Sequence, residues 1–178
     1  MSEINILLSA YEDVLSLPWE DYLAGQEKVW FVVYSPRNER RLRLHFQEFE
    51  LKTLDSGYDW LEVDITNTFP EWMASLDYRE AFFENPQDLD PKLEEYTDYV
   101  RTIIIDSLNR GDEDTVVAVY GLSTLFGLTH ASKVLEGVTN DIRGRLLVFF
   151  PGRYDGSVYR LLDARDGWNY LAVPITAN

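Results

Sequence analysis

The chain contains no cysteine, few basic residues and no long hydrophobic run. Without cysteine, a disulfide framework, a thiol nucleophile and a zinc–thiolate site are excluded. Sixteen basic residues against thirty-one acidic ones give a net charge of −15, which disfavours direct binding of nucleic acid because the average surface repels phosphate. Apolar runs such as residues 146–150 are too short to span a bilayer, and the first residues show no basic targeting region. We therefore expect a cytoplasmic protein with no membrane segment.

Phosphate-binding motifs are also missing. Residues 34–38, which follow the first apolar run, contain no glycine, although a phosphate loop needs flexible glycines followed by lysine and serine or threonine. No Gly-x-Gly-x-x-Gly stretch occurs in the chain. The sequence therefore encodes neither a nucleoside triphosphate site nor a dinucleotide site of the usual kinds.

The composition is that of a folded domain. With 178 residues, of which 46% are hydrophobic and 14% aromatic, the chain can bury one sizeable core, and we expect a single domain over residues 1–178. Residues 4–24 have the apolar spacing of an amphipathic helix that Pro18 either interrupts or restarts before Gly25. Residues 1–27 are thus predicted to form an N-terminal helical segment packed on the core.

Apolar runs alternate with helical periodicity along the rest of the chain. Strands are predicted at residues 28–34, 58–65, 115–120 and 145–150. Helices are predicted at residues 36–54, after Pro70, at 91–110 with Asp90 as cap and Gly111 as stop, and at 123–136 up to Gly137. Because Leu44 and Leu51 lie opposite the Leu42 side of the helix over 36–54, we expect that helix to be covered on two sides.

This order of elements predicts a three-layer α/β fold, with a mostly parallel sheet of about five strands flanked by helices. Residues 158–162 and 170–175 flank an Asp-Gly pair at 166–167 that suits a tight reversal. The last segment is therefore either a fifth core strand or half of a hairpin.

Four arginines follow the first predicted strand: Arg37, Arg40, Arg41 and Arg43. Cations at the start of a helix are disfavoured by the positive end of its dipole, so an anionic group should lie close to them. Two interpretations remain open. Either a phosphate, a nucleic-acid strand or an acidic partner binds there, or the arginines pair with carboxylates of the same chain.

A second candidate site is the aromatic stretch at residues 149–156. A strand ending at Pro151 would reach the edge where doubly wound sheets bind ligands, and the next residues would present Arg153, Tyr154 and Asp155 there. This stretch is either a recognition loop, or its Pro-Gly and Asp-Gly pairs make turns while its aromatic residues fill the core.

No catalytic constellation is visible. Ser123 follows a strand and Gly121, as in a nucleophile elbow, but the closing glycine is absent and His130 lies too far along the same predicted helix to reach it. We therefore interpret Ser123 as a helix cap. The acidic clusters at 88–90 and 112–114 lie beside predicted caps and turns. We expect no catalytic residue, no metal and no cofactor, and hence a protein that is not an enzyme.

Residues 149–156, Phe-Phe-Pro-Gly-Arg-Tyr-Asp-Gly, with Tyr-Arg-Leu at 159–161 and Asn-Tyr at 169–170, resemble the BrxB family of bacterial phage-exclusion (BREX) defence systems. The strand-to-turn segment 119–121 and the helix predicted after it also resemble that family, so the similarity spans about residues 28–175. Membership implies a small cytoplasmic component encoded beside a methyltransferase, a large ATPase and an alkaline-phosphatase-like PglZ protein, with a role in their assembly. It also implies a core like that of P-loop NTPases without the phosphate loop, and no known catalytic residue.

The expected function is therefore that of a non-enzymatic interaction protein that docks to a PglZ-like partner, and its acidity suits a partner with a basic surface. The alternative is a degenerate nucleotide- or nucleic-acid-binding module. That module would use Arg37, Arg40 and Arg41 together with Arg153.

Overall fold

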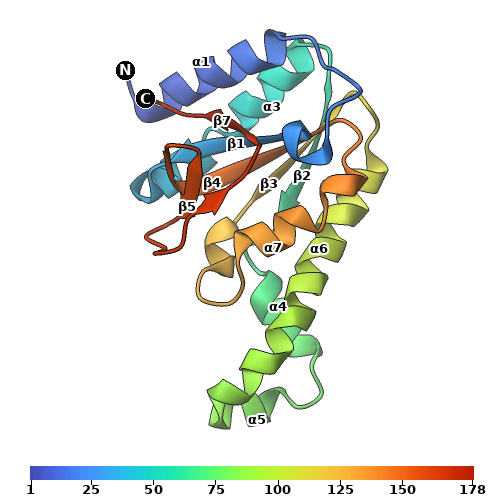
Figure 1. Ribbon diagram of the computed structural model, residues 1–178, viewed down its shortest axis with the longest axis vertical. Helices are drawn as coiled ribbons and strands as arrows, with labels where there is room; N and C mark the ends of the chain where they lie inside the picture. Colours follow the sequence, from blue (N-terminus) through green and yellow to red (C-terminus); the bar gives the residue numbers. More distant parts are fainter.

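The computed structural model describes all residues from Met1 to Asn178 and shows a mixed sheet flanked by helices (Figure 1). The α-helices are α1 (Glu3–Ser16), α2 (Glu39–Arg43), α3 (Phe46–Asp55), α4 (Thr68–Ser75), α5 (Arg79–Glu84), α6 (Leu93–Arg110) and α7 (Ala131–Glu136). Short 3-10 helices are η1 (Gly25–Lys28), η2 (Pro36–Asn38), η3 (Pro86–Lys92), η4 (Leu122–Leu125) and η5 (Thr139–Asp141). The strands are β1 (Val29–Tyr34), β2 (Asp59–Asp64), β3 (Thr115–Tyr120), β4 (Arg145–Asp155), β5 (Val158–Leu161), β6 (Trp168–Asn169) and β7 (Val173–Ile175).

The main path of the sheet has the strand order β2-β3-β4-β1-β7. Neighbours along this path run parallel; Val29 of β1 lies opposite Leu146 of β4, and Trp30 lies opposite Val173 of β7. The far end of β4 pairs antiparallel with β5, which in turn pairs with β6. The predicted α/β class is confirmed, and the sheet is mixed.

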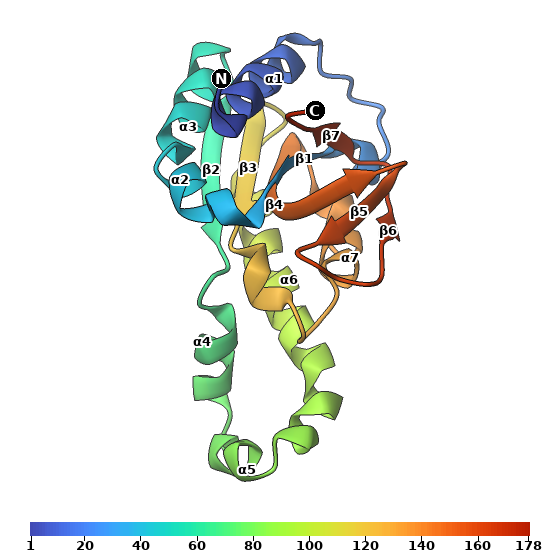
Figure 2. The same ribbon diagram turned by 90° about the vertical axis from the view of Figure 1, so that its left-hand side faces the viewer.

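Strand β1 is buried on both faces, as its continuous apolar run predicts. Phe31 belongs to a core cluster with residues of α4, α6 and α7, whereas Val32 belongs to a second cluster with residues of α1, α2 and α3. Because successive side chains of a strand point to opposite faces, the sheet separates the two clusters. Helices α1 and α3 therefore cover one face, and α6 and α7 cover the other (Figures 1 and 2).

The C-terminal aromatic residues fill the core, as one of the two interpretations of this region predicts. The Phe31 ring stacks on Phe150 at 5.1 Å between centroids and meets Tyr159 edge-on at 4.5 Å. Tyr170 is also buried, 5.9 Å from the Phe31 ring. The Tyr159 hydroxyl donates a hydrogen bond to the carbonyl of Ala172 at 2.8 Å, which ties β5 to the segment before β7.

Two N-terminal helices differ from their predicted extents. Helix α1 ends at Ser16, because Leu17 precedes a proline and adopts the extended backbone that this position favours. The helix predicted over 36–54 is divided into η2, α2 and α3, with a break at Leu44 and His45. The expectation that it is covered on two sides is wrong, since Leu44 is 83% exposed and Leu51 is 51% exposed.

Two further helix boundaries are corrected by the structure. Helix α6 starts at Leu93, so Asp90 lies in η3 and is not its cap, whereas Gly111 ends α6 as predicted. The helix predicted over 123–136 is interrupted, because Gly127 has φ +78°, a left-handed conformation outside the helical region. Ser123 lies inside η4 and caps no helix.

Strand β4 does not end at Pro151 but continues to Asp155. A Cβ atom at Gly152 would lie 1.9 Å from the carbonyl oxygen of Arg160, so the Pro-Gly pair provides close contact between β4 and β5 and not a turn. The reversal follows at Gly156 and Ser157, whose positive φ angles are those of a two-residue hairpin turn. Of the two interpretations of residues 170–175, that of a fifth core strand is confirmed, because β7 pairs with β1, whereas β5 pairs with β6, which lies before this segment.

Candidate interaction site at the carboxyl edge of the sheet

Four of the six predicted site residues lie together. Arg37 in η2 and Arg153, Tyr154 and Asp155 at the end of β4 line one open cavity of about 470 Å³. Although far apart in sequence, these segments meet because β1 and β4 are parallel neighbours whose carboxyl ends reach the same region of the sheet. The cavity therefore joins the two regions that the sequence singled out separately.

Arg40 and Arg41 lie on α2, are exposed to solvent and do not line this cavity. Among the four arginines that follow β1, only Arg43 forms an ion pair, with its Nε atom 2.9 Å from Oε1 of Glu39. Pairing within the chain thus accounts for Arg43 alone. Arg37, Arg40 and Arg41 keep their cationic groups free.

The loop after β1 already holds an anionic group, the carboxylate of Glu3 from the start of α1. Its Oε1 atom accepts a hydrogen bond from the backbone N–H of Ser35 at 3.0 Å, and its Oε2 atom accepts one from the side-chain amide of Asn38. Backbone amides directly after the first strand are those that a phosphate loop presents to its ligand. Glu3 occupies that position and also lines the same cavity as Arg37.

A second group of polar contacts links the ends of β1, β2 and β3. The Tyr34 hydroxyl donates a hydrogen bond to Glu39, and the pKa of Tyr34 is raised by burial first and by this carboxylate second. Arg43 donates from Nη2 to the Thr66 hydroxyl at 3.1 Å, and its guanidinium lies 5.4 Å from the centre of the Tyr120 ring. These contacts hold the carboxyl edge in one arrangement.

The segment that resembles a nucleophile elbow has a packing role. Gly121 has φ +95°, and a Cβ atom there would lie 2.5 Å from the Thr66 hydroxyl oxygen, so only glycine fits between the loops after β2 and β3. Ser123 lies in η4 and His130 is the residue before α7. The expectation that both lie on one helix is therefore wrong.

A second cavity, of about 460 Å³, lies between the first half of α6, the segment 126–133 and the β5–β6 hairpin. Half of its eighteen lining residues are hydrophobic, among them Leu93, Phe126 and Trp168. A cavity of this size and composition suits an apolar side chain or a small apolar molecule.

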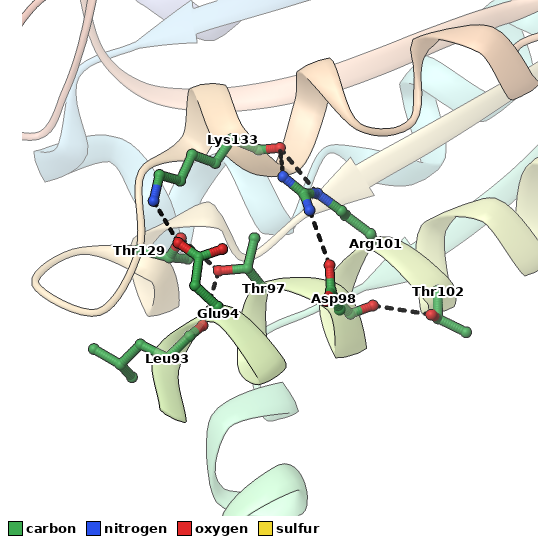
Figure 3. Close-up of polar contacts among 8 residues, drawn as sticks. All are labelled: Leu93, Glu94, Thr97, Asp98, Arg101, Thr102, Thr129 and Lys133. Atoms are coloured by element: carbon green, nitrogen blue, oxygen red, sulfur yellow. Dashed lines mark hydrogen bonds and ion pairs between the residues drawn. The ribbon is translucent and has the colours of Figure 1, made fainter. Parts of the chain in front are cut away.

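Polar contacts between α6 and α7 fix the wall of this second cavity (Figure 3). Nζ of Lys133 lies 2.5 Å from Oε1 of Glu94, which lowers the pKa of that carboxyl group. Nε and Nη2 of Arg101 donate to the Lys133 carbonyl at 3.0 and 2.5 Å, and the hydroxyl groups of Thr97 and Thr129 lie 2.7 Å apart. Helix α6 is thus joined to α7 at Lys133 and to the segment before α7 at Thr129.

Comparisons of the chain with protein-family models, with curated proteins and with solved structures found no match. No three histidine, aspartate or glutamate side chains lie close enough together to hold a metal ion. None of the helices combines the length and the apolar character that crossing a bilayer requires.

Sequence reasoning missed Glu3, which lies 32 residues before the loop that it contacts. No local motif marks such a contact, since Glu3 reads only as an acidic residue in the first turn of a helix. In chemical terms, the cavity offers two free guanidinium groups, from Arg37 and Arg153, beside the carboxylates of Glu3 and Asp155. This arrangement suits contact with charged side chains of another protein.

Proposed function

We propose that this protein is a non-enzymatic interaction component of a bacterial BREX-type anti-phage defence system, which acts in the cytoplasm and docks to a PglZ-like protein. The resemblance of residues 28–175 to the BrxB family supports the assignment to this system. Its other components, a methyltransferase and a large ATPase, are then further partners in the proposal. In this proposal the core is a mostly parallel sheet related to that of P-loop NTPases, without a phosphate loop.

The observation that carries the proposal is the hydrogen bond that the backbone amide of Ser35 donates to the carboxylate of Glu3 at 3.0 Å. A phosphate bound to the same amide would lie within about 4 Å of this carboxylate. At that separation two like charges repel by about 1 kcal/mol in water and about 4 kcal/mol at the effective dielectric constant near a protein surface. The end of β1 therefore favours a structural role over the binding of nucleotide.

The charge and the exposed apolar side chains also support binding to another protein. A net charge of −15 favours association with a basic surface and speeds the encounter. Large apolar side chains such as Tyr78 and Phe83 are more than two-thirds exposed. Their burial against a partner would contribute to the free energy of binding.

Co-expression with the PglZ-like protein tests the proposal. We expect a tagged form of this chain to recover that protein in stoichiometric amount at low salt and less of it at high salt, because the charge attraction is screened. As a control, the tagged chain is co-expressed with an unrelated acidic protein of similar size in place of the PglZ-like protein. Recovery of the chain alone at low salt would contradict the proposal.

A second candidate function is a degenerate nucleotide- or nucleic-acid-binding module. The observation that favours it is the set of unpaired arginines at 37, 40 and 41, one of which shares a cavity with Arg153. Under this function, replacing the three arginines by alanine should abolish binding to DNA or nucleotide and its salt dependence. Under the interaction function, the wild-type protein shows no such binding.

A further inference from the structure

The segment between β2 and β3 forms an arm that extends beyond the carboxyl edge of the sheet (Figures 1 and 2). We define the arm as residues 68–95, which include α4, α5, η3 and the first residues of α6. Its base is packed on the core through Trp72 and Met73 of α4. Its tip, residues 77–90, contains α5 and no fully buried residue.

Two large aromatic side chains are exposed at the tip. Tyr78 is 78% exposed and Phe83 is 71% exposed, whereas Phe82 between them in sequence is half-buried against the core. Phe82 thus anchors α5 and leaves the other two rings in solvent. An aromatic side chain can bury about 150–250 Å² at an interface, and aromatic residues are enriched among those that dominate binding energy.

The tip is also strongly acidic. Residues 68–95 contain eight carboxylates and two basic side chains, a net charge of −6. None of the tip carboxylates, which are those of Asp77, Glu80, Glu84, Asp88 and Asp90, forms an ion pair. The one basic side chain of the tip, Arg79, donates a hydrogen bond to the carbonyl of Ala74 in the arm itself. The carboxylates are therefore available to cations of another molecule.

The negative charge of the arm indicates which kind of partner can bind to it. A second copy of the chain that contacted the same surface symmetrically would bring two groups of charge −6 together, which disfavours that dimer. A basic surface gains from the attraction and offers counterions for the unpaired carboxylates. We propose that the arm tip is a docking surface for a different protein whose contact region is basic and has apolar depressions that receive Tyr78 and Phe83.

This inference rests on the proposed function and names the surface through which the chain would bind its partner. Its test compares two arm variants, Tyr78→Ser/Phe83→Ser and Glu80→Lys/Glu84→Lys, with matched controls elsewhere on the surface. The controls are Tyr22→Ser/Leu44→Ser, which alters two equally exposed apolar residues, and Asp13→Lys/Glu113→Lys, which makes the same charge change. All of these side chains are exposed, so the folded structure is retained, and thermal unfolding verifies this.

Binding of each variant to the purified PglZ-like protein is measured by calorimetry at two salt concentrations. We expect both arm variants to weaken binding by about tenfold or more, as loss of dominant interface residues does, and the controls to bind within about twofold of the wild type. The lysine variant should also lose most of the salt dependence. If the wild type binds and the arm variants bind equally well, the arm is not the docking surface, although the proposed function stands.

A second measurement judges the arm without that partner. A lysine- and leucine-rich amphipathic peptide is titrated into the isotope-labelled protein, and amide chemical shifts are followed. We expect the shift changes to centre on residues 77–90 and to vanish in the Tyr78→Ser/Phe83→Ser variant. Shift changes centred elsewhere, or self-association that this variant abolishes, would overturn the proposal. Failure of the wild type to bind the PglZ-like protein would instead contradict the proposed function.

Discussion

Replacing Glu3 by alanine removes the anionic group that the structure places at the end of β1. The substitution deletes the acceptor of two hydrogen bonds, from the Ser35 amide at 3.0 Å and from the Asn38 side chain. A hydrogen bond to a charged group contributes about 1.5–3 kcal/mol, and because Glu3 is only half-buried we take the lower value for the pair. Glu3 also lies in the first turn of α1, where a carboxylate adds about 0.3–1 kcal/mol. We expect a total loss of about 2–2.5 kcal/mol.

Urea unfolding followed by the fluorescence of the five tryptophans measures this loss. The matched control is Glu12→Ala on the same helix, which removes a surface ion pair with Lys52 and should cost at most about 1 kcal/mol. Sulfate or phosphate should stabilise Glu3→Ala more than the wild type, because the Ser35 amide is then open to an anion. A Glu3→Ala protein as stable as Glu12→Ala would refute the role given to this carboxylate.

Three further predictions concern the core, the strand junction and pH. Phe31→Ala should lower the free energy of unfolding by about 3–5 kcal/mol, because it empties the aromatic cluster, whereas Leu44→Ser at an 83% exposed position should change it by less than about 0.5 kcal/mol; equal effects in urea unfolding would contradict the assigned burial. Gly152→Ala should separate β4 from β5, since its Cβ would lie 1.9 Å from a carbonyl oxygen, and should speed hydrogen exchange at Leu161; unchanged exchange would argue against this contact. Burial raises the pKa of four tyrosines above the ordinary value of 10.0: Tyr11, Tyr34, Tyr159 and Tyr170. The pKa of each of these tyrosines is higher in the folded protein than in the unfolded chain. Their contribution to stability is therefore fully present below pH 10. Above pH 10 the free energy of unfolding falls by up to about 1.4 kcal/mol per pH unit for each tyrosine. These four tyrosines should therefore ionise only as the chain unfolds, and tyrosinate absorbance from all eleven tyrosines in the folded state would contradict this expectation.

The elements predicted most accurately are those whose periodicity alone determines them. The run of β1 has the length and β-rich composition of a buried strand, and apolar residues recur at helical spacing along the eighteen residues of α6; both predictions match the structure closely. Arg153 is also predicted at the carboxyl edge of the sheet, and Arg37 directly after the first strand, and parallel strands bring their ends to one side of a sheet. Their common cavity is a consequence of that topology.

The errors arise where distant contacts override local signals. Pro151 and Gly152 are typical of a turn, yet the facing strand β5 makes the glycine a point of close contact within a longer strand. Leu44 suggested a second buried side of its helix, but no element packs there. Glu3 contacts a loop 32 residues away, and the sequence contains no signal for that contact.

The central claim is that the chain binds a protein partner and needs no nucleotide to do so. The most direct measurement is a calorimetric titration of the purified chain into the purified PglZ-like protein, with and without ATP and magnesium. We expect a saturable one-to-one complex of the same affinity under both conditions, and no heat when ATP is titrated into the chain alone. A complex that forms only with ATP, or binding of ATP by the isolated chain, would contradict the claim.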